Sequence, residues 1–231
     1  VLYGGISAGI MLFGMSHIFG IVGTIQFSEM IAVFPTLEAW KIAVIMPSFL
    51  LFFVGIGYKI ACVPFHMWSP DVYQGSPSLI TSFMASVVKV AGFYAFYRVM
   101  TIGFQGSVNE WINIIGVLII ITLLLAGAMG LAQSNAKRML AYSSISHAGY
   151  IALIFFGLNN LSTYTLAFYL FAYSLSTVGV FMCLIWVEKL KRETSYEAFN
   201  GLAKTEPVLA VAAAVSLMSM AGIPFTAGFI G

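Results

Sequence analysis

Apolar runs of about 20 residues follow one another along this 231-residue chain, and they restrict what it can fold into. Hydrophobic residues make up 61% of the sequence and charged residues only 8%, whereas a soluble domain carries about 25% charged residues. Runs of this length suit helices that cross about 30 Å of hydrocarbon, whereas barrel strands alternate over about 10 residues. The composition predicts a polytopic all-α membrane protein, embedded in a lipid bilayer and without a nucleic-acid partner.

The polar segments between the runs predict about seven crossings in a single transmembrane domain that covers residues 1–231. Residues 23–41 are expected to form a polar connection. The first and last residues are apolar, which is typical of a fragment of a longer membrane protein. The expected crossings are 2–22, an element from 42 to about 75, 79–102, 111–132, 139–158, about 163–187, and one that begins near Pro207.

Two of these elements contain a proline at a point where the helix would otherwise continue. A straight helix over residues 42–75 would measure roughly 50 Å, which is too long for one crossing. Pro64 lacks a backbone donor and clashes with the preceding turn, so a break is expected near Cys62–Phe65. Pro224 predicts a second break near Gly222–Thr226. Interrupted helices at membrane depth occur where the backbone lines a cavity or the protein interior.

Three ionisable side chains, Lys59, Lys89 and His147, fall near the centres of different crossings, and His66 follows the first break. A lysine in hydrocarbon costs about 2.5–3.5 kcal/mol on insertion scales, so it normally has a partner or a water-filled cavity. One interpretation is that each group pairs locally and only fixes helix packing. The alternative is that the groups pass protons, because desolvation and nearby charges shift lysine toward neutrality and histidine titrates near neutral pH.

The acid nearest to Lys59 is Asp71, twelve residues further along and beyond the break, where it is typical of a helix-terminal carboxylate at the membrane interface. Lys59 and Lys89 are therefore expected to face a shared hydrated interior. Nearby hydroxyls that could connect such groups belong to Tyr58, Ser86, Ser143, Ser144 and Ser146. The aromatic residues Trp68, Tyr73, Trp111 and Trp186 suit the interface belts of a membrane protein.

Basic residues are unequally divided between the two sides of the predicted bundle. The connections near 71–78, 133–138 and 188–206 share one side if the first broken element counts as one crossing. That side holds six basic residues, and the other holds two, Lys41 and Arg98. The positive-inside rule then places the first side in the cytoplasm.

No cofactor or metal site is indicated by the sequence. The two cysteines, Cys62 and Cys183, lie singly in apolar runs and are expected to be buried hydrophobic residues. The spacing of iron–sulfur, zinc or haem ligands is absent, and so is a glycine-rich nucleotide loop. We predict no catalytic, cofactor-binding or metal-binding residue in this chain.

A family resemblance is carried by three stretches. The run KIACVPFHMWSPDVYQGSP at 59–77 resembles the signature of the antiporter-like membrane subunits of respiratory complex I, and its DVYQGSP part is most similar to the subunit N members. SNAKRMLAYSSISHAGY at 134–150 and MAGIPFTAGFIG at 220–231 agree with it. The resemblance covers essentially the whole chain.

The resemblance implies an inverted-repeat antiporter-like fold and assigns roles to particular positions. Lys59 matches the lysine of the first broken helix, Lys89 the connecting lysine of the next helix, and His147 a polar position toward the second half-channel. Pro64 and Pro224 match the helix breaks. The family also has a glutamate upstream and a lysine just downstream of the stretch compared here, and neither is in this sequence.

The function implied by the resemblance is proton translocation coupled to NADH oxidation by quinone. NADH, flavin, iron–sulfur clusters and quinone would be handled by partner subunits, and the other membrane subunits of complex I would be the partners. The expected location is the bacterial plasma (inner) membrane. One alternative is a cation/proton antiporter subunit, of the Na⁺/H⁺ type, with the same fold. Another is a membrane scaffold whose buried lysines serve packing.

Overall fold

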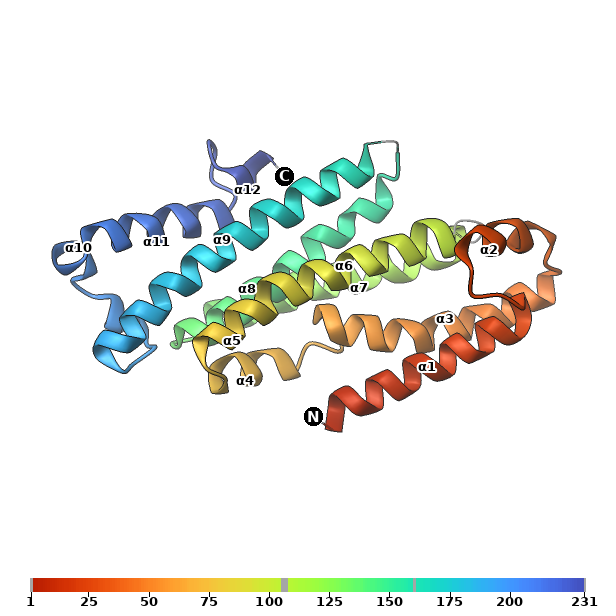
Figure 1. Ribbon diagram of the computed structural model, residues 1–231, viewed down its shortest axis with the longest axis horizontal. Helices are drawn as coiled ribbons and strands as arrows, with labels where there is room; N and C mark the ends of the chain where they lie inside the picture. The colour runs from red at the N-terminus through yellow and green to blue at the C-terminus, as the bar shows by residue number, and fades with distance from the viewer. Residues whose placement is uncertain (1, 105–107, 160, 231) are drawn as a thin grey trace.

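The computed structural model describes residues 2–104, 108–159 and 161–230, and in these ranges it forms helices and no strands (Figure 1). Residues 1, 105–107, 160 and 231 lie outside the description. The principal helices are α1 (Leu2–Val22), α2 (Phe27–Val33), α3 (Ala39–Ile60), α4 (Trp68–Gly75), α5 (Ser78–Phe83), α6 (Lys89–Arg98), α7 (Val108–Leu131), α8 (Ala136–Ala152), α9 (Ser162–Lys191), α10 (Leu202–Thr205), α11 (Pro207–Met220) and α12 (Ala227–Ile230).

Shorter helical turns connect or extend these helices. They are η1 (Phe34–Thr36), η5 (Leu153–Phe156) and η6 (Tyr196–Phe199), which are 3₁₀ turns, and η2 (Met84–Val88) and η3 (Val99–Gly103), which are π-helical. The π-helical turns are continuous with α5 and α6, so residues Ser78–Gly103 form one 26-residue helix.

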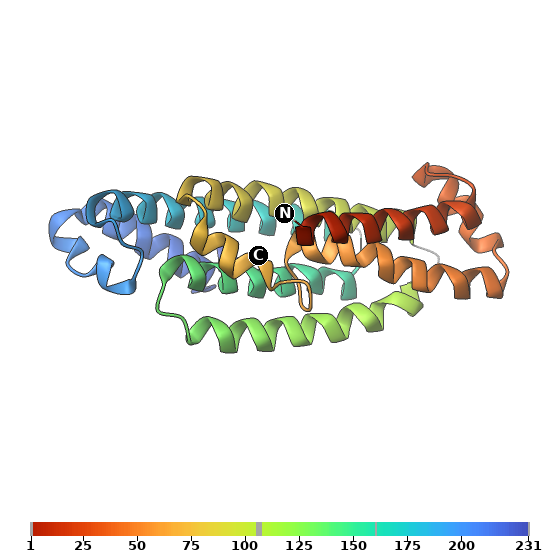
Figure 2. The same ribbon diagram turned by 90° about the horizontal axis from the view of Figure 1, so that it is seen from below.

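Six helices in the described part of the chain are long and apolar enough to cross a membrane, and α11 is a shorter apolar helix. They run side by side in an elongated bundle (Figures 1 and 2). Many large apolar side chains on the outer surface are exposed, as hydrocarbon contact requires. The chain is an integral, multi-pass helical membrane protein, as the sequence predicted. The expected number of crossings, about seven, remains a prediction.

Close helix pairs are built on small residues. α1 packs along α3, and a Cβ atom added at Gly14 would lie 2.6 Å from the backbone oxygen of Ser48. Only glycine fits at that contact. Without a hydrophobic driving force inside lipid, such close backbone approach supplies much of the attraction between helices.

An aromatic core fills the space between α3, α6 and α7. Phe49, Phe96 and Phe155 are almost completely buried there together with Trp111. The Trp111 indole donates a hydrogen bond of 3.1 Å to the carbonyl oxygen of Phe104. Trp111, the first residue of its candidate span, thus faces the protein interior with its indole nitrogen paired.

The connection 23–41 contains more helix than its polar composition suggested. It holds α2 and η1 before α3 begins at Ala39. At that start, Glu38 accepts a hydrogen bond of 2.8 Å from the Trp40 indole and lies 3.6 Å from the Lys41 ammonium group. These two contacts hold the pKa of the exposed Glu38 carboxyl below its usual value.

Three connections that were predicted to share one side of the membrane lie together in the fold. The Lys137 ammonium group donates to the carbonyl oxygen of Ser76 at 3.2 Å, and the Asn135 amide donates to the Thr194 hydroxyl at 2.9 Å. The turn between α4 and α5, the start of α8 and the segment after α9 thus form one end of the bundle (Figure 1). This end contains the basic residues counted above.

Candidate functional site

The first helix interruption is mostly buried, although Pro64 and Met67 are exposed. α3 ends at Ile60, Ala61 takes a left-handed conformation with φ of 56°, and α4 begins at Trp68. The Val63 amide donates to the Thr122 hydroxyl of α7 at 3.1 Å, and that hydroxyl donates to the Leu118 carbonyl at 2.6 Å. Freed backbone groups of the break are thus satisfied inside the bundle, as a membrane interior requires. The predicted break at Pro64 is confirmed.

The second interruption separates α11 from α12. α11 ends at Met220, Gly222 has φ of 68°, and α12 begins at Ala227. The Ser219 hydroxyl connects the two sides, because it lies 2.8 Å from the Ser176 hydroxyl and accepts from the Gly228 amide at 3.3 Å. The break predicted around Pro224 is confirmed, and most of its residues are exposed.

Lys89 is the central charged group of the site. It is 3% exposed and is the first residue of α6, directly after the π-helical turn η2. Its ammonium group donates to the Ser144 hydroxyl at 2.6 Å and also to the Ser144 carbonyl oxygen. No carboxylate of the described residues forms an ion pair with it. The ammonium group is therefore held in the interior by serine oxygens and not by a carboxylate.

Ser144 on α8 joins side chains from three other elements. The Tyr173 hydroxyl of α9 lies 3.0 Å from the Ser144 hydroxyl and 3.1 Å from the Ala85 carbonyl of the π-helical turn. The Tyr73 hydroxyl of α4 lies 3.5 Å from the same serine oxygen. Lys89 therefore enters a connected group of hydroxyls.

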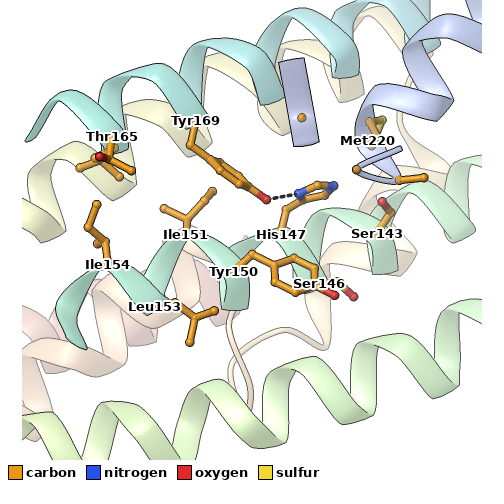
Figure 3. A pocket seen from close by; sticks show the side chains of 14 residues that line it. Ser143, Ser146, His147, Tyr150, Ile151, Leu153, Ile154, Thr165, Tyr169 and Met220 are labelled. Atoms are coloured by element: carbon orange, nitrogen blue, oxygen red, sulfur yellow. Dashed lines mark hydrogen bonds between the residues drawn. The ribbon is translucent and has the colours of Figure 1, made fainter. Parts of the chain in front are cut away.

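His147 continues this row toward a larger cavity. Its ring lies 4.9 Å from the Tyr173 ring, and its Nδ1 atom is 2.9 Å from the Tyr169 hydroxyl (Figure 3). The cavity measures about 610 Å³ and is partly open. Its lining combines α8 and α9 with the second interruption, through polar and apolar residues that include Ser143, Ser146, Tyr150, Thr165, Met220 and Gly222.

Lys59 shares a second cavity with Lys89. This cavity measures about 270 Å³, and Tyr58 and Tyr73 also line it. Lys59 and Lys89 therefore face one cavity, and Lys59 itself is exposed in the described chain. The reason is its position on α3, since the stem of Lys59 crosses Gly92 of α6 while its outer side has no covering helix in the described chain.

His66 lies in the first interruption and is buried. Its Nδ1 atom has no hydrogen-bond partner among the described residues, and the ring lines neither of the two cavities. The structure brings Lys89 and His147 into one row and Lys59 to its entrance. It does not bring His66 to that row.

Sequence reasoning missed the tyrosines of the site. Tyr73 was predicted at the membrane interface but is 3% exposed, and Tyr173 was not considered. A signal was present, because Tyr169 and Tyr173 are four residues apart in an apolar helix and so lie on one face. The expected hydroxyl of Ser144 takes part, whereas Ser143 and Ser146 line the larger cavity.

The fold and this site together define a class of protein: a polytopic helical membrane protein whose interior contains a row of amine, hydroxyl and imidazole groups between two cavities. The chain belongs to the family described as "NADH:quinone oxidoreductase/Mrp antiporter, TM", which it matches over residues 1–231.

Named relatives refine this membership. The chain is 39% identical over 243 residues to NADH-quinone oxidoreductase subunit N 2 of Sorangium cellulosum, and 40% identical over 240 residues to subunit N of Anoxybacillus flavithermus. Both comparisons cover 100% of this chain and 48% of the relative. The chain therefore spans about half the length of the curated relatives it matches.

Solved structures agree with the fold. A chain of respiratory complex I from Thermus thermophilus with bound aureothin is 33% identical, with a TM-score of 0.79 over 99% of this chain and 48% of that one. A chain of the Mrp complex from Dietzia sp. is 25% identical, with a TM-score of 0.88 over 100% of this chain and 42% of that one.

Proposed function

We propose that this chain is part of a proton-translocating membrane subunit of an NADH-quinone oxidoreductase. The observation that carries the proposal is the buried Lys89 ammonium group, which is bonded to Ser144 and lies between the two cavities. A lysine that only served packing would gain most from a carboxylate partner, because an isolated buried charge is costly. Lys89 instead contacts groups that can accept and donate protons.

In this proposal a proton moves from the cavity of Lys59 to Lys89 and on through Ser144 and Tyr173 toward His147. Transfer from Lys89 needs the Ser144 hydroxyl to accept at its oxygen while its own proton turns toward Tyr173. Tyr173 then has to turn away from the Ala85 carbonyl toward the imidazole. Water in the cavity beside His147 would complete the path, because the Tyr173 and His147 rings are in contact but no hydrogen bond joins these two side chains.

The chain would carry protons only. NADH, flavin, iron–sulfur clusters and quinone would belong to partner subunits. Its partners would be the other membrane subunits of the complex and the lipid bilayer. Relatives named from bacteria support a location in the bacterial plasma membrane.

A cation/proton antiporter subunit is the second candidate, and the overlay on the Mrp chain, with a TM-score of 0.88, favours it. Identity favours the first candidate, at 33% against 25%. Assay of Na⁺-driven proton exchange in vesicles, with and without NADH oxidation, separates the two. NADH-independent exchange would support the antiporter.

The orientation is part of the proposal, with the end that holds the 133–138 and 188–206 connections in the cytoplasm. A single cysteine introduced at Ser195 should react with a membrane-impermeant maleimide only from the cytoplasmic side. Labelling from the outer side would reverse the orientation.

Lys89→Met tests the function itself. NADH-driven proton uptake by vesicles that contain the whole complex should fall by about tenfold or more, since a missing relay group adds at least ~1.4 kcal/mol to the barrier. Electron transfer from NADH to an artificial acceptor should persist and would report assembly. Lys89→Arg should not restore uptake fully, because arginine keeps its proton at any relevant pH. A normal proton-to-electron ratio in Lys89→Met would leave only the packing role.

A further inference from the structure

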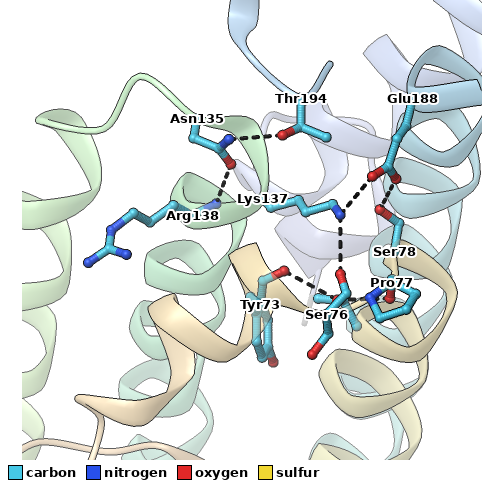
Figure 4. Close-up of polar contacts among 10 residues, drawn as sticks. Tyr73, Ser76, Pro77, Ser78, Asn135, Lys137, Arg138, Glu188 and Thr194 are labelled. Atoms are coloured by element: carbon cyan, nitrogen blue, oxygen red, sulfur yellow. Dashed lines mark hydrogen bonds and ion pairs between the residues drawn. The ribbon is translucent and has the colours of Figure 1, made fainter. Parts of the chain in front are cut away.

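An ion pair between a buried lysine and a partly exposed glutamate lies at one end of the bundle. The Lys137 ammonium group lies 3.0 Å from a Glu188 carboxylate oxygen, and the other oxygen of Glu188 accepts from the Ser78 hydroxyl (Figure 4). Lys137 also donates to the Ser76 carbonyl at 3.2 Å. Four helix ends meet there: the end of α4 and the starts of α5 and α8 meet the last turns of α9.

The pair lies where each charge is unfavourable for its own helix. Lys137 is in the first turn of α8, and Glu188 is in the last turn of α9. A helix dipole favours an anion at the N-terminus and a cation at the C-terminus, so both residues oppose the dipole of the helix that carries them. Lys137 is moreover 3% exposed. Local helix stability therefore does not explain this pair, whereas a contact between helices does.

Two to four turns away from the pair, the same helices carry the side chains of the proposed proton row. α8 carries Lys137 and, seven residues later on the same face, Ser144. α9 carries Tyr173 ahead of Glu188, and the helix that begins at Ser78 continues into Lys89. The pair thus joins the helices whose side chains meet at Ser144.

We propose that Lys137 and Glu188 form a positioning pair that keeps Lys89 in contact with Ser144 and Tyr173. Neither residue touches the transferred proton in this proposal. Only the expected effect of the pair on pumping rests on the proposed function. Its structural consequence is independent of that function, because loss of the pair loosens the contact of α5 and α6 with α8.

The first measurement follows the site and not the activity. A cysteine introduced at Ser144, in a full-length chain without other cysteines, reports whether the Lys89 contact is closed. Lys137→Met and Glu188→Gln should each raise its labelling by a small membrane-permeant maleimide by about tenfold or more, since local opening exposes a residue that is otherwise buried. The charge-reversed double variant Lys137→Glu with Glu188→Lys should restore slow labelling.

The neighbouring ion pair supplies a matched control. Arg138 follows Lys137 in α8, and its side chain points away from Lys137 (Figure 4). Its guanidinium group lies 2.5 Å from a carboxylate oxygen of Asp71 in α4. The Asp71 side chain is 72% exposed. Arg138→Met and Asp71→Asn should leave labelling unchanged, because exposed pairs contribute little to stability.

Proton uptake by vesicles containing the complex, with Ser144 intact, gives the second measurement. The single variants should lose much of the proton-to-electron ratio, and the charge-reversed variant should regain it. Failure of the charge-reversed variant to restore either measurement, or labelling as slow in Lys137→Met as in the controls, would overturn the proposal. Loss of uptake in Glu188→Gln alone, with normal uptake in Lys137→Met, would also overturn it and mark Glu188 as a proton-collecting group. If labelling changes as expected in the Lys137 and Glu188 variants while Lys89→Met pumps normally, the positioning pair stands and the proposed function is refuted.

Discussion

The two helix interruptions arise from similar sequence, yet the protein builds them differently. The first, between α3 and α4, is mostly buried, and its Val63 amide is bonded to Thr122 of another helix. The second, between α11 and α12, is held mainly by Ser219 and leaves Phe225 fully exposed. A proline decides where a helix ends, whereas the surrounding helices decide how rigid the interruption becomes. We therefore expect substitutions at the first interruption to be the more destabilising.

Removal of the acceptor at the first interruption should have the largest effect. Thr122→Val leaves the Val63 amide buried without a partner, which costs about 1–3 kcal/mol. Thermal unfolding of the purified full-length protein in detergent should show a clear decrease in Tm. Thr226→Val is the matched control at the second interruption, because the Thr226 hydroxyl donates to the nearby Ile223 carbonyl and the residue is partly exposed. Equal losses for both variants would contradict the difference between the two regions.

A smaller loss is expected for Trp68→Phe. The Trp68 indole donates to the Tyr58 carbonyl at 2.9 Å and stacks on the Tyr58 ring, so it fastens the start of α4 to the end of α3. The lost hydrogen bond should lower stability by about 0.5–1.5 kcal/mol, while the Phe ring retains most of the stacking. The same unfolding measurement applies. A loss as large as that of Thr122→Val would show that this contact is the main support of the interruption.

The smallest change in global stability is expected for Gly228→Ala. A Cβ atom there would lie 1.8 Å from the Ser219 carbonyl oxygen, so α12 has to move. Because its surroundings are exposed, this movement should change the free energy of unfolding by only about 0.5 kcal/mol. Gly157→Ala, where an added Cβ atom meets nothing within 4 Å, is the control. A large decrease in Tm for Gly228→Ala alone would show that the second interruption is as firmly built as the first.

Much of this architecture could be predicted from sequence because its causes are local. Proline ends a helix through its own ring, so both interruptions were found at Pro64 and Pro224. Lys89 was recognised because it lies at the centre of an apolar run, and the structure places it in the interior. These features depend on residues close together in the chain.

What could not be predicted depends on contacts between distant segments. The hydrogen-bonded ion pair between Lys137 and Glu188 joins residues 51 positions apart, and no local sequence pattern indicates it. Tyr173 reaches Ser144 from another helix, 29 positions away. The exposure of Lys59 likewise follows from which side of α3 is covered, and a periodic pattern alone does not specify the neighbouring helix.

The π-helical turn η2 has a consequence for the angular phase of the helix that carries Lys89. A widened turn inserts one extra residue, and each residue of a helix advances its direction by about 100°. Everything after Val88 is therefore rotated relative to a regular helix that begins at Ser78. Phe93 and Phe96 share the resulting phase with Lys89, and all three are buried. A single-residue deletion within 84–88 would rotate this whole face by about 100° and move Lys89 away from Ser144, so the length of the segment is as constrained as its composition.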